Sequence, residues 1–227
     1  IAHRGYWKTA GSAQNSITSL QKADSIHCYG SEFDVWLAKD NKLVVNHDPV
    51  YKMKYMEYSK GDALTGLKLS NGENLPSLQK YLEAGKKCNT KLILELKAHN
   101  SKKRETKAVQ EILAMVKKMG LEDRMEYITF SLHAMKEFIR LAPAGTPVFY
   151  LNGELSPKEL KDLGAAGLDY HMGVIKKHPE WIKEAHDLGL KVNVWTVDKA
   201  EDMKWLIDQK VDFITTNEPI VAQDMLK

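Results

Sequence analysis

The sequence is poor in cysteine and contains no long apolar run. Cys28 and Cys88 are the only cysteines among 227 residues, and each lies near the end of a predicted helix. We expect two free buried thiols, because the alternative, a disulfide, requires those two helices to be neighbours. No stretch approaches the roughly 18 consecutive apolar residues of a membrane-spanning helix, so we expect no transmembrane segment.

A large excess of charge of one sign is also missing. The chain has 33 basic and 30 acidic residues, a net charge of +3 that is scattered along the sequence. This balance argues against nucleic acid as a partner. Hydrophobic residues make up 43% and charged residues 28%, which is typical of a globular protein with a sizeable core.

The sequence starts directly on an apolar strand, Ile1-Ala2. We therefore expect the natural chain to carry further residues upstream, and the absence of a signal peptide says nothing about location. The compartment, cytoplasmic or secreted or periplasmic, stays open, as does the oligomeric state.

Strand-like segments alternate with segments of helical periodicity. We predict strands at Ile1–Gly5, Ser31–Leu37, Leu92–Lys97, Tyr127–Ser131, Pro147–Leu151, Leu168–Met172, Val192–Val197 and Asp212–Thr216. We predict helices at Ser16–Ile26, Ser77–Lys87, Thr106–Met119, Ala134–Leu141, Pro157–Leu163, Pro179–Leu188 and Lys199–Gln209. This order favours a single-domain (β/α)8 barrel over residues 1–227. An open doubly wound sheet is the alternative, but Gly5-Tyr6-Trp7 is no glycine-rich phosphate loop.

Two features interrupt the alternation after the second strand. Lys42–Asn46 follows so closely that it must form an antiparallel hairpin through the turn Asp40-Asn41. We expect this register to set His47 opposite Asp34. An insertion at residues 49–76 then covers the barrel mouth or binds substrate, with a poorly ordered loop as the alternative. We expect its Tyr and Met side chains to form an apolar lip.

Charged residues cluster at the ends of two predicted strands. Glu32 and Asp34 are two apart, so their side chains leave the same face, and Glu95 and Lys97 repeat this geometry. Three converging carboxylates favour one divalent cation, and all-oxygen ligands suit Mg²⁺ or Ca²⁺. The alternative is a salt-bridge network in which Arg4 and Lys97 balance the acids without a metal.

Two histidines complete the candidate site. Cleavage of a phosphoester needs one group to take a proton from the attacking oxygen and one to protonate the leaving oxygen, and His3 and His47 can serve in these roles. Arg4 and Lys97 would bind phosphate oxygens. Trp195 ends a strand, where its indole either contacts substrate or closes the barrel layer.

The order of these motifs resembles the glycerophosphodiester phosphodiesterase family. The resemblance rests on His3-Arg4-Gly5, Glu32-Phe33-Asp34, His47-Asp48 and Glu95-Leu96-Lys97, and later on Val194-Trp195-Thr196-Val197 and Ile214-Thr215-Thr216-Asn217-Glu218-Pro219. It implies that His3 and His47 are the general acid and base, that Arg4 and Lys97 contact phosphate, and that the three acids hold the metal. One departure is Gln14, which stands where the family usually has Glu.

The leading hypothesis is therefore metal-dependent hydrolysis of a glycerophosphodiester to glycerol 3-phosphate and an alcohol. One alternative keeps the site but acts on a lipid, as a lysophospholipase D-type phosphodiesterase. Another is a Schiff-base lyase that uses Lys97. A barrel that binds a phosphodiester without cleaving it is the non-enzymatic alternative.

Overall fold

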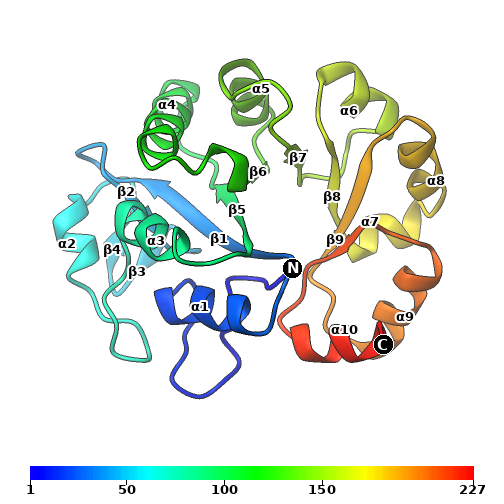
Figure 1. Ribbon diagram of the computed structural model, residues 1–227. Coiled ribbons are helices and arrows are strands. Elements are labelled where there is room, and N and C mark those ends of the chain that lie inside the picture. The colour runs from blue at the N-terminus through cyan, green and yellow to red at the C-terminus, as the bar shows by residue number, and fades with distance from the viewer.

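A curled, mostly parallel sheet forms the centre of the molecule. The computed structural model describes all 227 residues. Its eight-stranded sheet has the order β10-β9-β8-β7-β6-β5-β1-β2, in which only β2 is antiparallel to its neighbour. The strands are β1 Gly30–Leu37, β2 Leu43–Val45, β5 Lys91–Leu96, β6 Met125–Thr129, β7 Val148–Tyr150, β8 Gly167–His171, β9 Lys191–Trp195 and β10 Phe213–Ile214. The helices lie around the outside of this sheet (Figure 1).

The start of the chain joins the two ends of the parallel sheet. Ala2 forms parallel bridges to Ser31 in β1 and to Thr216 after β10. The amide of Glu32 donates to the Ala2 carbonyl at 2.9 Å, and the amide of His3 donates to the Thr216 carbonyl at 2.9 Å. The N-terminal segment thus acts as the eighth parallel strand, and the predicted (β/α)8 barrel is confirmed.

This first strand is much shorter than the predicted Ile1–Gly5. The chain leaves the sheet at Arg4 and Gly5, whose φ angles are 57° and 79°. A β-carbon on Gly5 would lie 2.1 Å from the hydroxyl oxygen of Ser19, so only glycine fits this turn. The turn directs the Arg4 side chain to the end of the barrel where the β1 and β5 acids lie.

The helices begin largely where the sequence predicts. They are α1 Ile17–Ser25, α3 Leu78–Gly85, α4 Lys102–Lys118, α5 Leu132–Leu141, α6 Pro157–Leu163, α8 Glu180–Asp187 and α9 Ala200–Asp208. A serine caps each of the first five of these, and its side chain accepts a hydrogen bond from the third helical amide. The short helices α2 Gly61–Thr65, α7 Met172–Lys177, α10 Pro219–Met225 and the 3₁₀ turn Glu122–Arg124 were not predicted.

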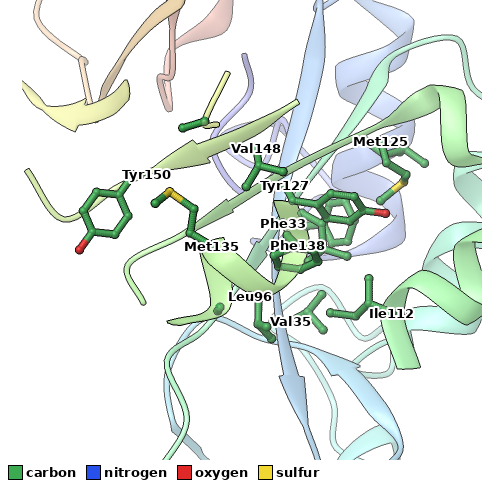
Figure 2. Close-up of a cluster of buried hydrophobic side chains, with 14 of the residues drawn as sticks. Phe33, Val35, Leu96, Ile112, Met125, Tyr127, Met135, Phe138, Val148 and Tyr150 are labelled. Carbon is green, nitrogen blue, oxygen red and sulfur yellow. The ribbon is translucent and has the colours of Figure 1, made fainter. Parts of the chain in front are cut away.

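The main hydrophobic core lies between the sheet and the helices. In Figure 2, Tyr127 stacks on Phe138 with ring centroids 4.5 Å apart, and Phe33 of β1 lies beside them. Both predicted thiols, Cys28 and Cys88, are free and buried. No helix has the length and apolar character needed to cross a membrane.

The hairpin after β1 is present, with its register one residue away from the prediction. Val35 pairs with Val45 and Trp36 with Val44, so Asn46 rather than His47 lies opposite Asp34. The Asn46 amide donates to the Asp34 carbonyl at 3.0 Å. His47 is therefore the first residue beyond this pairing, where the chain turns away from β1.

The insertion at residues 49–76 has its own secondary structure and a small core. It contains the hairpin β3 Val50–Tyr51 and β4 Lys54–Tyr55, followed by α2. Met56 is fully buried in this core, with Leu64, Leu69 and Leu75 of the insertion. Met56 therefore belongs to the packing of the insertion and not to an apolar lip. Side chains of the hairpin and the residues after it remain exposed: Met53, Tyr55 and Tyr58.

Candidate active site

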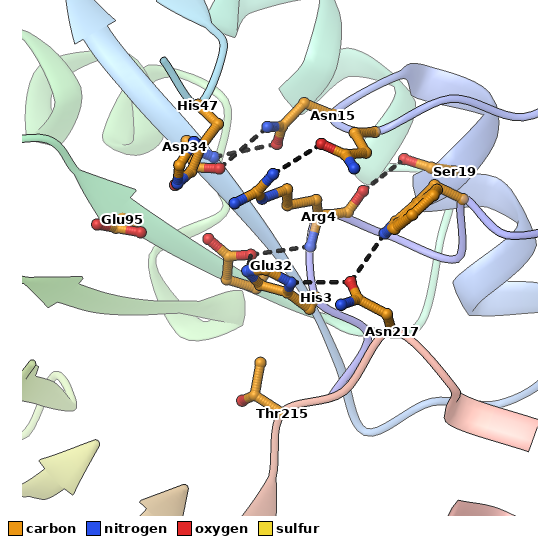
Figure 3. A network of polar contacts seen from close by, with 12 residues as sticks. His3, Arg4, Asn15, Ser19, Glu32, Asp34, His47, Glu95, Thr215 and Asn217 are labelled. Carbon is orange, nitrogen blue, oxygen red and sulfur yellow. Dashed lines mark hydrogen bonds and ion pairs between the residues drawn. The ribbon is translucent and has the colours of Figure 1, made fainter. Parts of the chain in front are cut away.

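Three buried carboxylates meet at the carboxyl ends of β1 and β5. Glu32 and Asp34 lie on β1, and Asp34 pairs with Glu95 on β5. One oxygen from each side chain lies within 4.8 Å of the other two. Figure 3 shows the three side chains on the same side of the sheet, as the spacing of two along each strand requires.

The close approach of these three carboxylates, the acidic trio Glu32, Asp34 and Glu95, is favourable only if a positive charge lies near them. Burial and the neighbouring carboxylates raise the pKa of both Glu32 and Glu95 well above the ordinary range. Burial also disfavours the ionised form of Asp34, yet hydrogen bonds and the charge of Lys97 lower its pKa to about 2. Glu32 Oε1 and Asp34 Oδ1 are buried without a hydrogen-bond partner. Unpartnered carboxylate oxygens converging on one point fit a hard divalent cation.

Two cationic side chains flank the acids. Lys97 Nζ lies 3.1 Å from Glu95 Oε1 and 3.7 Å from Asp34 Oδ1. Although burial favours the neutral amine, these carboxylates raise the pKa of Lys97. On the other side, the Arg4 main-chain amide donates to Glu32 Oε2 at 2.8 Å. The Arg4 guanidinium donates to Gln14 Oε1 at 2.7 Å, and its Nε is buried without a hydrogen-bond partner.

The proton on His3 is assigned by its neighbours. Asn217 Oδ1 accepts the indole N–H of Trp7 at 2.9 Å, while the Asn217 amide nitrogen donates to Asp198. His3 Nδ1 lies 2.9 Å from the same Asn217 oxygen, so Nδ1 must be the protonated nitrogen. Nε2 then offers its lone pair 4.0 Å from Glu32 Oε2. Burial lowers the pKa of His3 to about 4, with the charge of Arg4 adding to the effect, so the ring is neutral near pH 7.

His47 has a different setting at the outer edge of the site. Its Nδ1 lies 2.7 Å from Asp48 Oδ1, and its side chain is 35% exposed. Trp36 donates its indole N–H to the His47 carbonyl at 3.3 Å, and Asn46 donates to the Asp48 carbonyl at 2.8 Å. Because a carboxylate oxygen can only accept, the Nδ1–H of His47 donates to Asp48, and Nε2 is the ring nitrogen left for a ligand.

One pocket brings most of the predicted residues together. It has a volume of about 110 Å³, and six of the eight predicted site residues line it: His3, Arg4, Glu32, His47, Glu95 and Trp195. Of the other two, Asp34 belongs to the group of three carboxylates, and Lys97 forms ion pairs with Glu95 and Asp34. The rest of the wall consists of Ile128, Phe130, Leu151, Asp169, Thr196 and Thr215.

Trp195 is fixed in this wall. Its indole N–H donates to the main-chain oxygen of Asp169 at 2.8 Å. Its ring packs edge-on against Phe130 and His171, with centroids 5.6 and 5.1 Å away. The indole therefore closes the barrel layer and also lines the pocket, and its contact with substrate stays a prediction.

A second hollow adjoins the pocket and shares Arg4 and His47 with it. It has a volume of about 490 Å³ and lies between the barrel and the insertion, where Tyr51 and Leu69 contribute to its wall. Most of the other residues that line it are polar, among them Lys8, Ser12, Gln14, Asn15, Asn46, Asp48 and Ser70.

Comparison with known proteins assigns the chain to a family. The model of the glycerophosphoryl diester phosphodiesterase family matches residues 3–221. The chain belongs to this family. The match begins at His3 and covers every residue of the predicted site, so the resemblance inferred from the four motifs is confirmed.

Individual family members are similar over nearly their whole length. A crystallised glycerophosphodiester phosphodiesterase from Parabacteroides distasonis is 53% identical, with a TM-score of 0.98 over 100% of this chain and 95% of that one. The glycerophosphodiester phosphodiesterase of Caldanaerobacter subterraneus subsp. tengcongensis is 27% identical over 96% of this chain and 93% of its own length. An Oleispira antarctica phosphodiesterase, solved with its product sn-glycerol-3-phosphate, shares the fold at 22% identity, with a TM-score of 0.84 over 100% and 95% of the two chains.

This member of the phosphodiesterase family also contains site residues that the sequence did not reveal. Asn15 donates to Asp34 Oδ2 at 3.0 Å and accepts from the Asp34 amide at 3.2 Å. Asp198 holds Asn217, and thereby His3, in place. Asp169 lines the pocket. Only Asp169 had a readable signal, because an acid in the middle of a buried strand is unusual.

Proposed function

We propose that this protein is a metal-dependent phosphodiesterase that hydrolyses glycerophosphodiesters to glycerol 3-phosphate and an alcohol. The observation that carries the proposal is the set of buried, unpartnered carboxylate oxygens beside two histidines in one pocket. A salt-bridge network without a metal is less satisfactory, because Lys97 leaves Asp34 Oδ1 at 3.7 Å and nothing reaches Glu32 Oε1. Membership of the phosphodiesterase family supports the reaction class.

The charged residues would bind the phosphodiester and its metal. Glu32, Asp34 and Glu95 would hold one Mg²⁺ or Ca²⁺, and this cation would stabilise negative charge on the phosphate oxygens. Arg4, whose Nε has no hydrogen-bond partner, would bind a non-bridging oxygen and orient the phosphorus centre. Lys97 lowers the pKa of Asp34 and opposes the rise in the pKa of Glu95, and its positive charge would stabilise a pentavalent transition state.

The two histidines would divide the proton transfers according to their contacts. His3 is neutral with Nε2 unprotonated, so it is suited to take the proton from the attacking oxygen. His47 is paired with Asp48 and lies nearer solvent, so it is suited to protonate the leaving alcohol. The alcohol would then depart through the polar hollow that His47 shares.

The walls of the two hollows favour a small polar substrate. Most of the side chains that line the hollow beside the insertion are polar, and such groups suit a polar alcohol better than an acyl chain. A lysophospholipid is therefore the less favoured substrate, and its hydrolysis should not increase with chain length. A Schiff-base lyase is also disfavoured, because the raised pKa of Lys97 keeps its amine protonated and non-nucleophilic.

The attacking oxygen could be the glycerol 2-hydroxyl, giving a cyclic phosphate first, or water. A search for the cyclic phosphate during hydrolysis in ¹⁸O-labelled water separates these routes, because a water oxygen enters the final product by either one. Direct attack gives label in glycerol 3-phosphate with no cyclic product at any time, whereas attack by the hydroxyl gives a transient cyclic phosphate.

The test of the function is turnover of glycerol 3-phosphocholine and glycerol 3-phosphoethanolamine by the purified protein. We expect EDTA to abolish turnover and Mg²⁺ or Ca²⁺ to restore it. Full activity in excess chelator would mean that the acids have a structural role. No turnover of either diester with any divalent cation would revive the alternative of a binding barrel.

A further inference from the structure

Asp169 is the unexplained group in the pocket. It lies in the middle of β8, is 1% exposed, and forms part of the same wall as Trp195 and Thr215. Its Oδ1 is buried without a hydrogen-bond partner. None of the roles proposed above for the metal, the phosphate or the protons uses this carboxyl group.

Its neighbours are arranged so that they leave the carboxyl group free. Trp195 donates its indole N–H to the main-chain oxygen of Asp169. Thr215 donates its hydroxyl to Asn193, at 3.0 Å. Two donors close to Asp169 are thus engaged elsewhere. Burying a polar group without a partner is unfavourable, so a donor from a ligand in the pocket is expected.

The surroundings indicate what kind of ligand group this is. Apart from the residues already assigned to the metal, the phosphate and the protons, Asp169 is the only acidic or basic residue that lines the pocket. Around it, Ile128, Phe130 and Leu151 present apolar surface. A carboxyl group among apolar walls suits a short carbon chain that ends in a hydroxyl.

The charge state favours the same conclusion. Burial raises the pKa of Asp169 to about 8, and the negative charge of Glu126 adds to this effect. A neutral carboxyl group can both donate to and accept from a hydroxyl, whereas a cationic head group would require the ionised form. The small volume of the pocket, about 110 Å³, suits a three-carbon unit better than a bulky quaternary amine.

We propose that Asp169 binds the terminal hydroxyl of the glycerol unit and so selects diesters whose glycerol is unsubstituted at that position. The glycerol would lie inside the barrel, with the phosphate at the acids and the other alcohol in the outer hollow. This inference rests on the proposed function. It adds a specificity residue that excludes acylated glycerols, because an ester at this oxygen removes the donor and adds bulk.

The test compares two diesters that differ in one group. One is glycerol 3-phosphocholine, and the other is its propane-1,2-diol analogue, which keeps the 2-hydroxyl and the choline but ends in a methyl group. We expect the wild-type protein to prefer the first by about 10- to 100-fold in kcat/KM, the usual effect of a hydrogen bond to a buried acid. Asp169→Ala should lose about this factor on the glycerol diester and stay within about threefold on the analogue.

Two further variants keep the result interpretable. Asp169→Asn preserves the shape and one acceptor oxygen, so its loss on the glycerol diester should be intermediate. Glu105→Gln changes a buried acid elsewhere, one that accepts from Ser131 at 2.7 Å and lies outside the pocket. It should leave the preference between the two diesters unchanged.

The outcomes separate the inference from the proposed function. Wild-type turnover of glycerol 3-phosphocholine tests the function first, and its absence would overturn both. With turnover present, an equal loss on the two diesters in Asp169→Ala and Asp169→Asn would show a structural role. A wild-type protein without preference, or an unchanged preference in both variants, would also overturn the assignment.

Discussion

Replacing Glu32 by Gln tests the metal site without depending on catalysis. Glu32 Oε2 accepts from the Arg4 amide, and a glutamine oxygen can keep this bond. Oε1 has no partner, and two other carboxylate oxygens lie within 4.8 Å of a Glu32 oxygen. Two full charges at this separation repel by about 3.5 kcal/mol at an effective dielectric constant of about 20. Without a cation, Glu32→Gln should therefore be at least as stable as the wild-type protein.

With a bound cation, the wild-type protein should instead be more stable than Glu32→Gln. A ligand present at about 1,000 times its Kd stabilises a protein by about 4 kcal/mol, and a 100-fold loss of affinity reduces this to about 1.4 kcal/mol. For a chain of this size these energies correspond to Tm increases of about 8–16 °C and about 3–6 °C. We therefore expect Mg²⁺ or Ca²⁺ to raise the Tm of the wild-type protein far more than that of Glu32→Gln.

The assay is thermal unfolding at a series of cation concentrations, with EDTA as the baseline. Glu126→Gln is the matched control, because it removes a buried acid that is not in the trio. It should keep the full cation-dependent increase in Tm. An equal increase in Glu32→Gln and the wild-type protein would remove Glu32 from the proposed ligands, and no increase in either would refute the metal site.

Three further predictions concern catalysis, phosphate binding and pH. His3→Ala and His47→Ala should each lower kcat by at least about 100-fold while keeping the cation-dependent Tm increase, and wild-type kcat in either would contradict its role. Gln14→Ala removes the acceptor that orients Arg4, so KM should rise about threefold with little change in kcat, whereas Gln14→Glu keeps an acceptor and should not raise KM. The pKa of Asp169 is raised to about 8, so the folded protein retains a proton that the unfolded chain releases near pH 4, and stability falls as pH rises between these values. Asp169→Asn lacks this titration, so its Tm advantage over the wild-type protein should grow from pH 5 to pH 8; a constant difference would mean that the carboxyl group has a partner in the folded state.

The sequence was sufficient for the barrel and for most of the site. Buried strands followed by serine-capped helices are strong local signals, and the spacing of Glu32 and Asp34 placed both on one face of β1. The pocket then required only that parallel strands end on the same side of the barrel. These properties are local or follow from topology.

Other features depend on tertiary contacts, which no local sequence pattern predicts. The hairpin register differs by one residue, because the Asp40-Asn41 turn admits more than one pairing and packing selects between them. The insertion lacked periodicity because its core uses single residues such as Met56 and Leu64 against Trp36. The network from Asp198 through Asn217 to His3 joins residues about 200 positions apart and is visible only in three dimensions.

The Ala2 bridges have a consequence for when the enzyme can work. His3 and Arg4 follow a segment that is held only between β1 and the stretch after β10, so its position depends on residues near both termini. During synthesis Thr216 emerges 214 residues after Ala2. A nascent chain that ends before Thr216 would therefore lack a positioned His3 and Arg4, and hydrolysis should begin only after this last stretch has docked.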